Sequence, residues 1–165
     1  MFRIENILVP VDLSTSAQAA YALAASLSGE ERPNIHLAHA VQPLHSYTRD
    51  VLFPYAPLGE DDVEFEHEML EAARDRIYAT YEIEPDAQPG HVMTRIELGP
   101  ARELLPEFAR TTGADLVVMG AFGEAGVYPD ALGSLAERTI RSARQPVLLT
   151  RDYGTQPTID RITIA

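Results

Sequence analysis

The feature that most constrains this chain is a regular alternation between short, uninterrupted apolar runs and segments with helical periodicity. The apolar runs lie at residues 7–11, 35–41, 91–98, 116–119 and 146–150, and the helical segments lie at 17–27, 61–84, 100–112 and 135–143. Continuous apolar runs are typical of strands that are covered on both faces. Strands that alternate with helices join through right-handed parallel crossovers. The pattern therefore predicts a doubly wound α/β fold, with a five-stranded parallel sheet and helices on both faces.

Two prolines modify the predicted helix that follows Gly99. Pro100 is expected at its first position, where a missing N–H costs nothing. Pro106 lies inside the helix and removes one backbone hydrogen bond. We therefore expect a bend at Pro106 or a delayed start of the helix.

Length favours a single domain. The chain has 165 residues, enough for one sizeable core and short for two. The pattern ends near residue 151, so we expect one domain over residues 1–151 and a C-terminal tail over 152–165. The tail ends in a β-prone run that predicts either an extra, exchanged strand or the start of a second repeat.

Charge and composition exclude several kinds of partner and chemistry. The formal net charge is −12, which repels nucleic acid and anionic membrane surfaces. All 13 basic residues are arginine, so no lysine is available to grip a phosphate. The absence of cysteine removes disulfides, thiolate nucleophiles and cysteine-bound zinc. The N-terminus has no signal-like segment, so a cytoplasmic location is expected.

The topology predicts where a ligand binds. In doubly wound sheets, ligands lie outside the carboxyl ends of the strands, where the strand order reverses. The first strand ends at Asp12, the second at Ala40 and Val41, and the fourth at Met119 and Gly120. The loops after the first and fourth strands are therefore the expected neighbours of a ligand.

A glycine pattern follows the fourth strand. Gly120 and Gly123 are separated by two residues, and after nine more residues Gly133 and Ser134 open a helix. Glycines let the backbone approach an anion, and a helix N-terminus adds free N–H donors. The pattern is consistent with a phosphate site. It is also consistent with a turn at Gly120 and Gly123 and a helix cap at Gly133 and Ser134.

Three motifs give the chain a resemblance to the universal stress protein family. They are ILVPVDLS at residues 7–14, GADLVVMGAFG at 113–123 and LGSLAERTIRSARQPVLLTR at 132–151. The glycine spacing also resembles the ATP-binding pattern of that family, and the resemblance covers residues 4–151. It implies the Rossmann-like fold of adenine nucleotide alpha hydrolases and an ATP-binding regulatory or signalling role in the stress response.

The resemblance implies a set of ATP-binding residues in this chain. Asp12 would accept hydrogen bonds from ribose or adenine, although a plain helix-capping role is the alternative, because three hydroxyl residues follow closely and could also cap. The other implied contacts are Pro10 and Val11 beside the adenosine, Ala40 through its backbone, Met119 in the base pocket, and Gly120, Gly123, Gly133, Ser134 and Leu135 at the phosphates. The resemblance also implies a homodimer through the last strand, Val147–Thr150.

The glycine loop departs from the family pattern in its charges. Phe122 stands where a polar group is usual, and Glu124 and Asp130 are the only charged residues of the loop. A carboxylate about 5 Å from a phosphate charge costs roughly 3 kcal/mol at an effective dielectric of 20. These acids therefore predict weak ATP binding, or a Mg²⁺ ion that bridges them to the phosphates, or carboxylates that point into solvent.

Two other functions stay open on the sequence. One is a dimeric interaction protein of the stress response that binds no nucleotide, and the other is a slow ATPase. No set of side chains predicts a catalytic triad or a general base. Glu64 and His67 share a helical face, but a single copy of this pair indicates a solvated acidic surface rather than a metal site.

Overall fold

The computed structural model describes residues 3–27, 33–42, 59–83, 91–122 and 132–151. Its elements follow one another as β1 (Asn6–Pro10), α1 (Thr15–Ser26), β2 (Asn34–Val41), α3 (Glu60–Thr80), β3 (Val92–Leu98), α4 (Ala101–Thr111), β4 (Leu116–Gly120), α5 (Ser134–Ser142) and β5 (Val147–Thr150). This order confirms the predicted alternation of strands and helices. The predicted tail, residues 152–165, and Gly123 lie outside the described residues.

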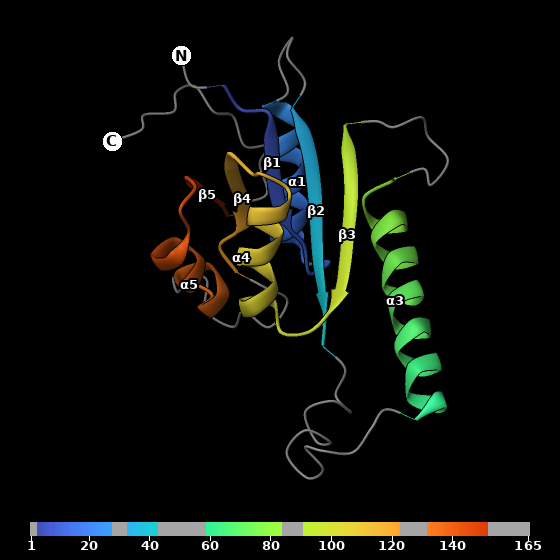
Figure 1. Cartoon of the computed structure of the whole chain (residues 1–165). Helices are drawn as coiled ribbons and strands as arrows, with labels where there is room; N and C mark the ends of the chain where they lie inside the picture. The colour runs from blue at the N-terminus through green and yellow to red at the C-terminus, as the bar shows by residue number, and fades with distance from the viewer. Residues whose placement is uncertain (1–2, 28–32, 43–58, 84–90, 123–131, 152–165) are drawn as a thin grey trace.

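The five strands form one parallel sheet in the order β3-β2-β1-β4-β5. β1 is central, with β2 paired along one edge and β4 along the other. The strand order therefore reverses at β1 and β4, as the doubly wound prediction requires. Figure 1 shows α4 and α5 in front of the strands and α1 behind them.

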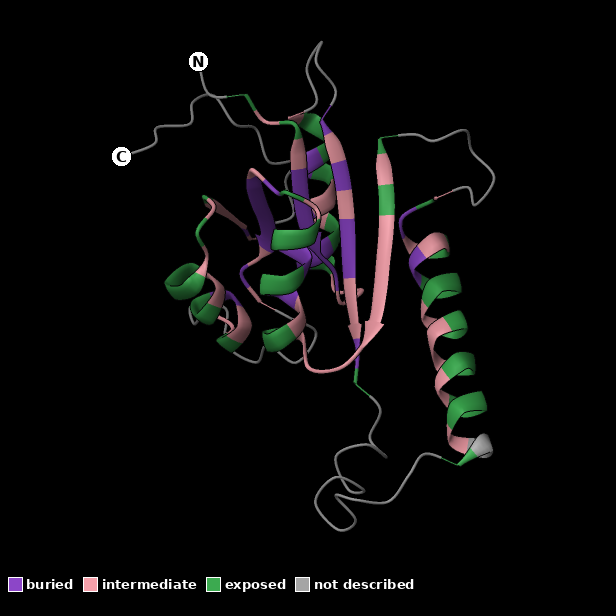
Figure 2. Cartoon of the chain, in the orientation of Figure 1, coloured by how far each residue is buried: buried purple, intermediate pink, exposed green. Residues whose placement is uncertain are grey.

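Side-chain alternation along the central strand divides the core into two layers. Ile7 and Val9 face a cluster that includes residues of α1 and α3. Leu8 faces the opposite cluster, which includes residues of α4 and α5. Successive side chains of a strand point to opposite faces, so the uninterrupted run of β1 serves both layers at once. Figure 2 shows burial concentrated in these central strands.

The two prolines act differently from the sequence expectation. Pro100 is the residue before the first turn of α4. The carbonyl of Pro100 accepts hydrogen bonds from the N–H groups of Glu103 and Leu104. Pro106 lies inside a helix that begins at Ala101, so the predicted delayed start is wrong. Phe108, two residues after the proline, is fully buried.

The C-terminal end of α3 packs against the sheet, whereas its other half is more exposed. Ile77 and Tyr81 are buried, but Val63 and Phe65 are exposed. Among the described residues, no helix is long and apolar enough to cross a membrane.

Candidate functional site

The carboxyl ends of β1, β2 and β4 meet at one edge of the sheet. Pro10 of β1 is in register with Ala38 of β2, and Leu8 is in register with Val117 of β4. The residues that follow these strands therefore face one another across the point where the strand order reverses. This is the place at which the sequence predicted a ligand.

A cleft of about 320 Å³ opens at this edge. Every predicted site residue that the structure describes lines it: Pro10, Val11, Asp12, Ala40, Met119, Gly120, Gly133, Ser134 and Leu135. The structure thus gathers residues that are separated by more than a hundred positions in the chain. Their role in binding a ligand stays a prediction.

Asp12 is held by the turn that leads into α1. The carboxylate oxygen Oδ1 accepts hydrogen bonds from the backbone N–H and the hydroxyl of Ser14, at 3.2 and 2.5 Å. The Ser14 hydroxyl in turn accepts from the N–H of Ala17 at 3.1 Å and is the N-cap of α1. Ser14 therefore caps the helix, and Asp12 orients the cap while it also lines the cleft.

The turn itself is strained at Leu13. This residue has a φ of 67°, in the left-handed region that side chains other than glycine rarely adopt. Strained backbone of this kind persists where surrounding contacts over-determine it, often at functional sites. Leu13 packs against the core cluster of α1, and this contact helps to hold the turn that presents Asp12.

Behind Asp12, Tyr81 has a buried hydroxyl that finds no hydrogen-bond partner among the described residues. Its ring packs edge-on against Tyr21, with 5.3 Å between the ring centroids. Burial, and then the negative charge of Asp12, raise the pKa of the Tyr81 phenol. The phenol therefore stays neutral, and the charge on this side of the cleft is that of Asp12.

Gly120 lies in close contact with Ser16 of α1. A Cβ atom at this position would lie 2.4 Å from the Ser16 hydroxyl oxygen and 3.0 Å from the Ser16 carbonyl carbon. Thr150 stabilises the same contact, because its hydroxyl donates a hydrogen bond to the Ser16 carbonyl at 3.2 Å. Packing alone therefore requires glycine at position 120, whatever ligand the cleft holds.

The backbone of Gly133 differs from the sequence expectation. Its N–H donates to the carbonyl of Ala121 at 2.8 Å, so this amide does not face an anion as the glycine pattern predicted. Its carbonyl accepts from the N–H of Glu137. No side chain caps α5 at Gly133, and the first N–H groups of a helix have no partner inside the helix. The donors that an anion would meet here belong to Ser134 and the residues after it.

The sequence analysis did not identify His39 as a cleft residue. His39 lines the cleft near the end of β2, and its Nδ1 lies 2.7 Å from the carbonyl oxygen of Val11. A carbonyl only accepts, so Nδ1 donates in this contact, and in that tautomer Nε2 is the acceptor. The only sequence signal was the position of His39 close to a strand end.

Phe122 forms part of the cleft wall, and Arg151 lies beside it. The Arg151 guanidinium is 5.2 Å from the centroid of the Phe122 ring, within the range of a cation–π contact. The sequence showed no basic residue in the glycine loop. The fold brings one next to the cleft from the end of β5.

Among the described residues, no three His, Asp or Glu side chains come together in a way that could hold a metal ion. Glu124 and Asp130, which the sequence offered as ligands of a bridging ion, lie outside those residues.

Comparisons with known proteins agree with this architecture. A model of the Universal stress protein family matches residues 3–151. Universal stress protein A homolog 2 from Coxiella burnetii is 31% identical over 134 residues, which cover 79% of this chain and 83% of that protein.

Solved structures show the same fold at lower identity. The structure of hypothetical protein MJ0577 has a TM-score of 0.72 at 22% identity, over 92% of this chain and 99% of that one. A universal stress protein in complex with cAMP has a TM-score of 0.53 at 21% identity, over 89% of this chain and 96% of that one.

Proposed function

The chain belongs to the universal stress protein family, and we propose that within it the protein is an ATP-binding regulatory module of the cytoplasmic stress response. One observation carries the proposal: the cleft at the β1 and β4 ends is lined by every described residue of the predicted nucleotide site. Its volume of about 320 Å³ lies in the range of small-molecule sites. A structural neighbour of this fold is in complex with cAMP, which is also an adenine nucleotide.

The adenosine would occupy the side of the cleft formed by the ends of β1 and β2. Asp12 offers carboxylate oxygens to ribose or adenine, and Ala40 offers backbone groups. The free Nε2 of His39 adds an acceptor that suits the adenine amino group or a ribose hydroxyl. Met119 supplies an apolar surface for the base.

The phosphates would lie at the start of α5. The uncapped N–H groups of Ser134 and Leu135 and the positive end of the helix dipole favour an anion there. Arg151, beside Phe122, adds a positive charge near the cleft. This charge opposes the repulsion expected from the acidic loop residues Glu124 and Asp130, and we propose that a Mg²⁺ ion accompanies the phosphates.

The direct test is whether nucleotide accompanies the purified protein. Native protein is denatured, and the supernatant is chromatographed for adenine nucleotides, while Mg-ATP is titrated calorimetrically into nucleotide-free protein. We expect adenine nucleotide in the supernatant and saturable binding in the titration, because the cleft residues converge on one ligand. Asp12→Ala is expected to weaken binding by about tenfold, the loss of a charge-assisted hydrogen bond.

Three outcomes separate the candidate functions. If neither extraction nor titration detects nucleotide, the result favours the dimeric interaction protein. Phosphate release above a blank, lost in Asp12→Ala, would indicate slow ATP hydrolysis. Binding without release supports the regulatory module.

We also propose that the protein is a homodimer through β5. The N–H groups of Val117 in β4 and of Ala121, the residue after β4, donate to the carbonyls of Pro146 and Thr150. By the alternation of a strand, Leu149 then directs its N–H away from β4. β5 is the last strand of the sheet, and an apolar edge invites pairing with another copy.

Leu149→Pro tests this edge. Proline removes the outward N–H of residue 149 without removing a bond to β4, and edge strands tolerate it. We expect the native chain to be a dimer by light scattering and the variant to be a monomer with native-like circular dichroism. A native chain that is monomeric at about 100 µM, well above typical dissociation constants, would refute the dimer.

A further inference from the structure

A second and larger cavity lies between α4 and α5, on the sheet face opposite α1. It is a groove of about 670 Å³. Its floor is aliphatic and buried: Leu8 and Val117 from the strands, and Leu105 and Ala109 from α4. The groove and the proposed nucleotide cleft share three lining residues, Pro10, Leu105 and Leu135.

α5, which forms one wall of the groove, buries little of its own surface. Among the described residues of this helix, only Ala136 is buried. Ile140 has 46% of its surface exposed. Because α5 buries so little of its surface, there is room for a ligand between α5 and α4.

Arginine dominates the charges along the groove. Its lining includes Arg102, Arg110, Arg138 and Arg144 but only two acids, Glu103 and Glu107. The formal charge of the lining is therefore +2, on a chain whose net charge is −12. A positive surface on so acidic a chain favours an anionic ligand.

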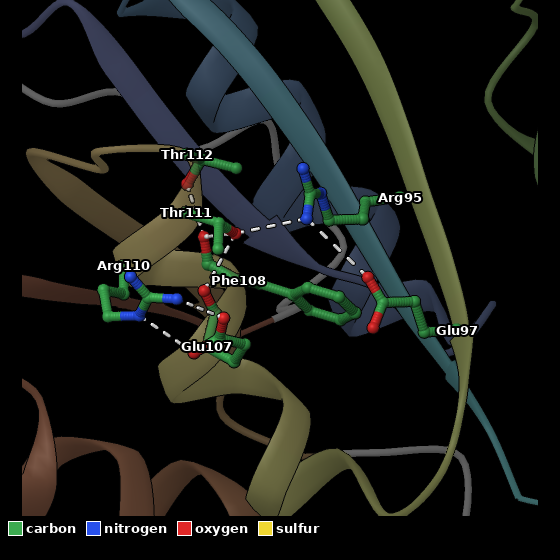
Figure 3. Close-up of polar contacts among 7 residues, drawn as sticks. All are labelled: Arg95, Glu97, Glu107, Phe108, Arg110, Thr111 and Thr112. Carbon is green, nitrogen blue, oxygen red and sulfur yellow. Dashed lines mark hydrogen bonds and ion pairs between the residues drawn. The ribbon is translucent and has the colours of Figure 1, made fainter.

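The two arginines on α4 are already paired. Arg110 forms two hydrogen bonds with the carboxylate of Glu107, as Figure 3 shows. Arg102 lies 3.3 Å from Glu103. In the described part of the chain, Arg138 and Arg144 have no acidic partner. These two guanidinium groups, on the α5 side, are the ones available to a ligand.

The hydroxyl groups of the α5 wall are also engaged. Thr139 donates to the carbonyl of Leu135 at 2.8 Å, and Ser142 donates to the carbonyl of Arg138 at 2.9 Å. A peptide or a sugar needs many hydrogen-bonding partners, and this wall provides few. A ligand with one anionic head and an aliphatic body matches what the groove offers.

We propose that the groove between α4 and α5 binds a single-chain amphiphilic carboxylate. The alkyl chain lies along the apolar lining to which Leu105, Ala109 and Leu135 contribute, and the carboxylate meets Arg138 and Arg144. Guanidinium and carboxylate groups form strong, paired, charge-assisted hydrogen bonds. The proposal is independent of the nucleotide, since a chain that binds no ATP keeps this groove.

The test is a calorimetric titration of decanoate into the full, delipidated chain, below the concentration at which decanoate forms micelles. We expect saturable binding of one decanoate per chain. The double variant Arg138→Gln/Arg144→Gln is expected to bind decanoate at least about tenfold more weakly than the native chain does. The uncharged decanamide is expected to bind the native chain as weakly as decanoate binds the double variant. All these residues are exposed, so the variants should fold normally.

Arg141→Gln is the matched control. Arg141 lies on the same helix and pairs with Glu137 at 2.8 Å, but it does not line the groove. Decanoate affinity should be unchanged in this variant. The proposal is overturned if decanoate does not bind, if the double variant binds it as well as native protein, or if an acidic amphipathic peptide binds in its place.

Discussion

Gly120→Ala is expected to destabilise the protein strongly, by about 1–3 kcal/mol or more, as overpacking of a well-packed core does. The added methyl group would lie 2.4 Å from the hydroxyl oxygen of Ser16 and 3.0 Å from its carbonyl carbon. Ser16 is buried, and its carbonyl accepts a hydrogen bond from Thr150. Because a backbone atom cannot rotate away, α1 or β4 must shift. Urea or thermal unfolding measures the loss.

Two further variants show whether the close approach is the cause. Ser16→Ala combined with Gly120→Ala removes the nearest atom, so it should recover part of the stability that Gly120→Ala loses. Gly113→Ala has open space around its Cβ but a φ of +61°, so it should cost only about 1 kcal/mol in backbone conformation. If Gly120→Ala proves no worse than Gly113→Ala, the contact between α1 and β4 is looser than the structure indicates.

Ser134→Glu is expected to weaken ATP binding by about two orders of magnitude. Ser134 lines the cleft as the first residue of α5. A carboxylate about 5 Å from a phosphate charge costs roughly 3 kcal/mol at an effective dielectric of 20, which is about a hundredfold in affinity. The fold should tolerate the change, since an acidic residue stabilises the first turn of a helix. Calorimetric titration of Mg-ATP gives the affinity.

The control for charge is Ser134→Gln, which has the shape of glutamate without its charge. This variant should lose at most about fivefold in ATP affinity, which corresponds to the loss of one neutral hydrogen bond. Adenosine, which carries no phosphate, should bind the Glu and Gln variants equally. Equal loss of ATP affinity in both variants, or loss of adenosine affinity in the Glu variant alone, would place the phosphates elsewhere.

The position of the site could be predicted from the sequence because it follows from topology. Parallel strands bring all their carboxyl ends to one edge of the sheet, so Asp12 and Gly120 must be neighbours once β1 and β4 pair. The same reasoning could not find His39 or Arg151. A strand-end histidine and an arginine after the last strand have no periodic signal, and their contacts with Val11 and Phe122 depend on loop geometry.

The roles of the glycines show the same division. The glycine pattern of the sequence predicts that the backbone amides of Gly120 and Gly133 bind an anion. In the structure, Gly120 is required by the side chain and backbone of Ser16, more than a hundred residues earlier. The amide of Gly133 donates to Ala121 across a loop. Neither partner is adjacent in the sequence, so local pattern could not reveal them.

The sequence by itself determined the α/β class, the parallel sheet and the edge at which a ligand would bind. It could do so because hydrophobic periodicity is local, and because βαβ connections have one favoured hand. Only the tertiary structure decided which donors remain free in the cleft, and that an arginine-lined groove lies between α4 and α5. Those properties depend on packing between distant segments, where shifts of an ångström decide whether a group is paired or available.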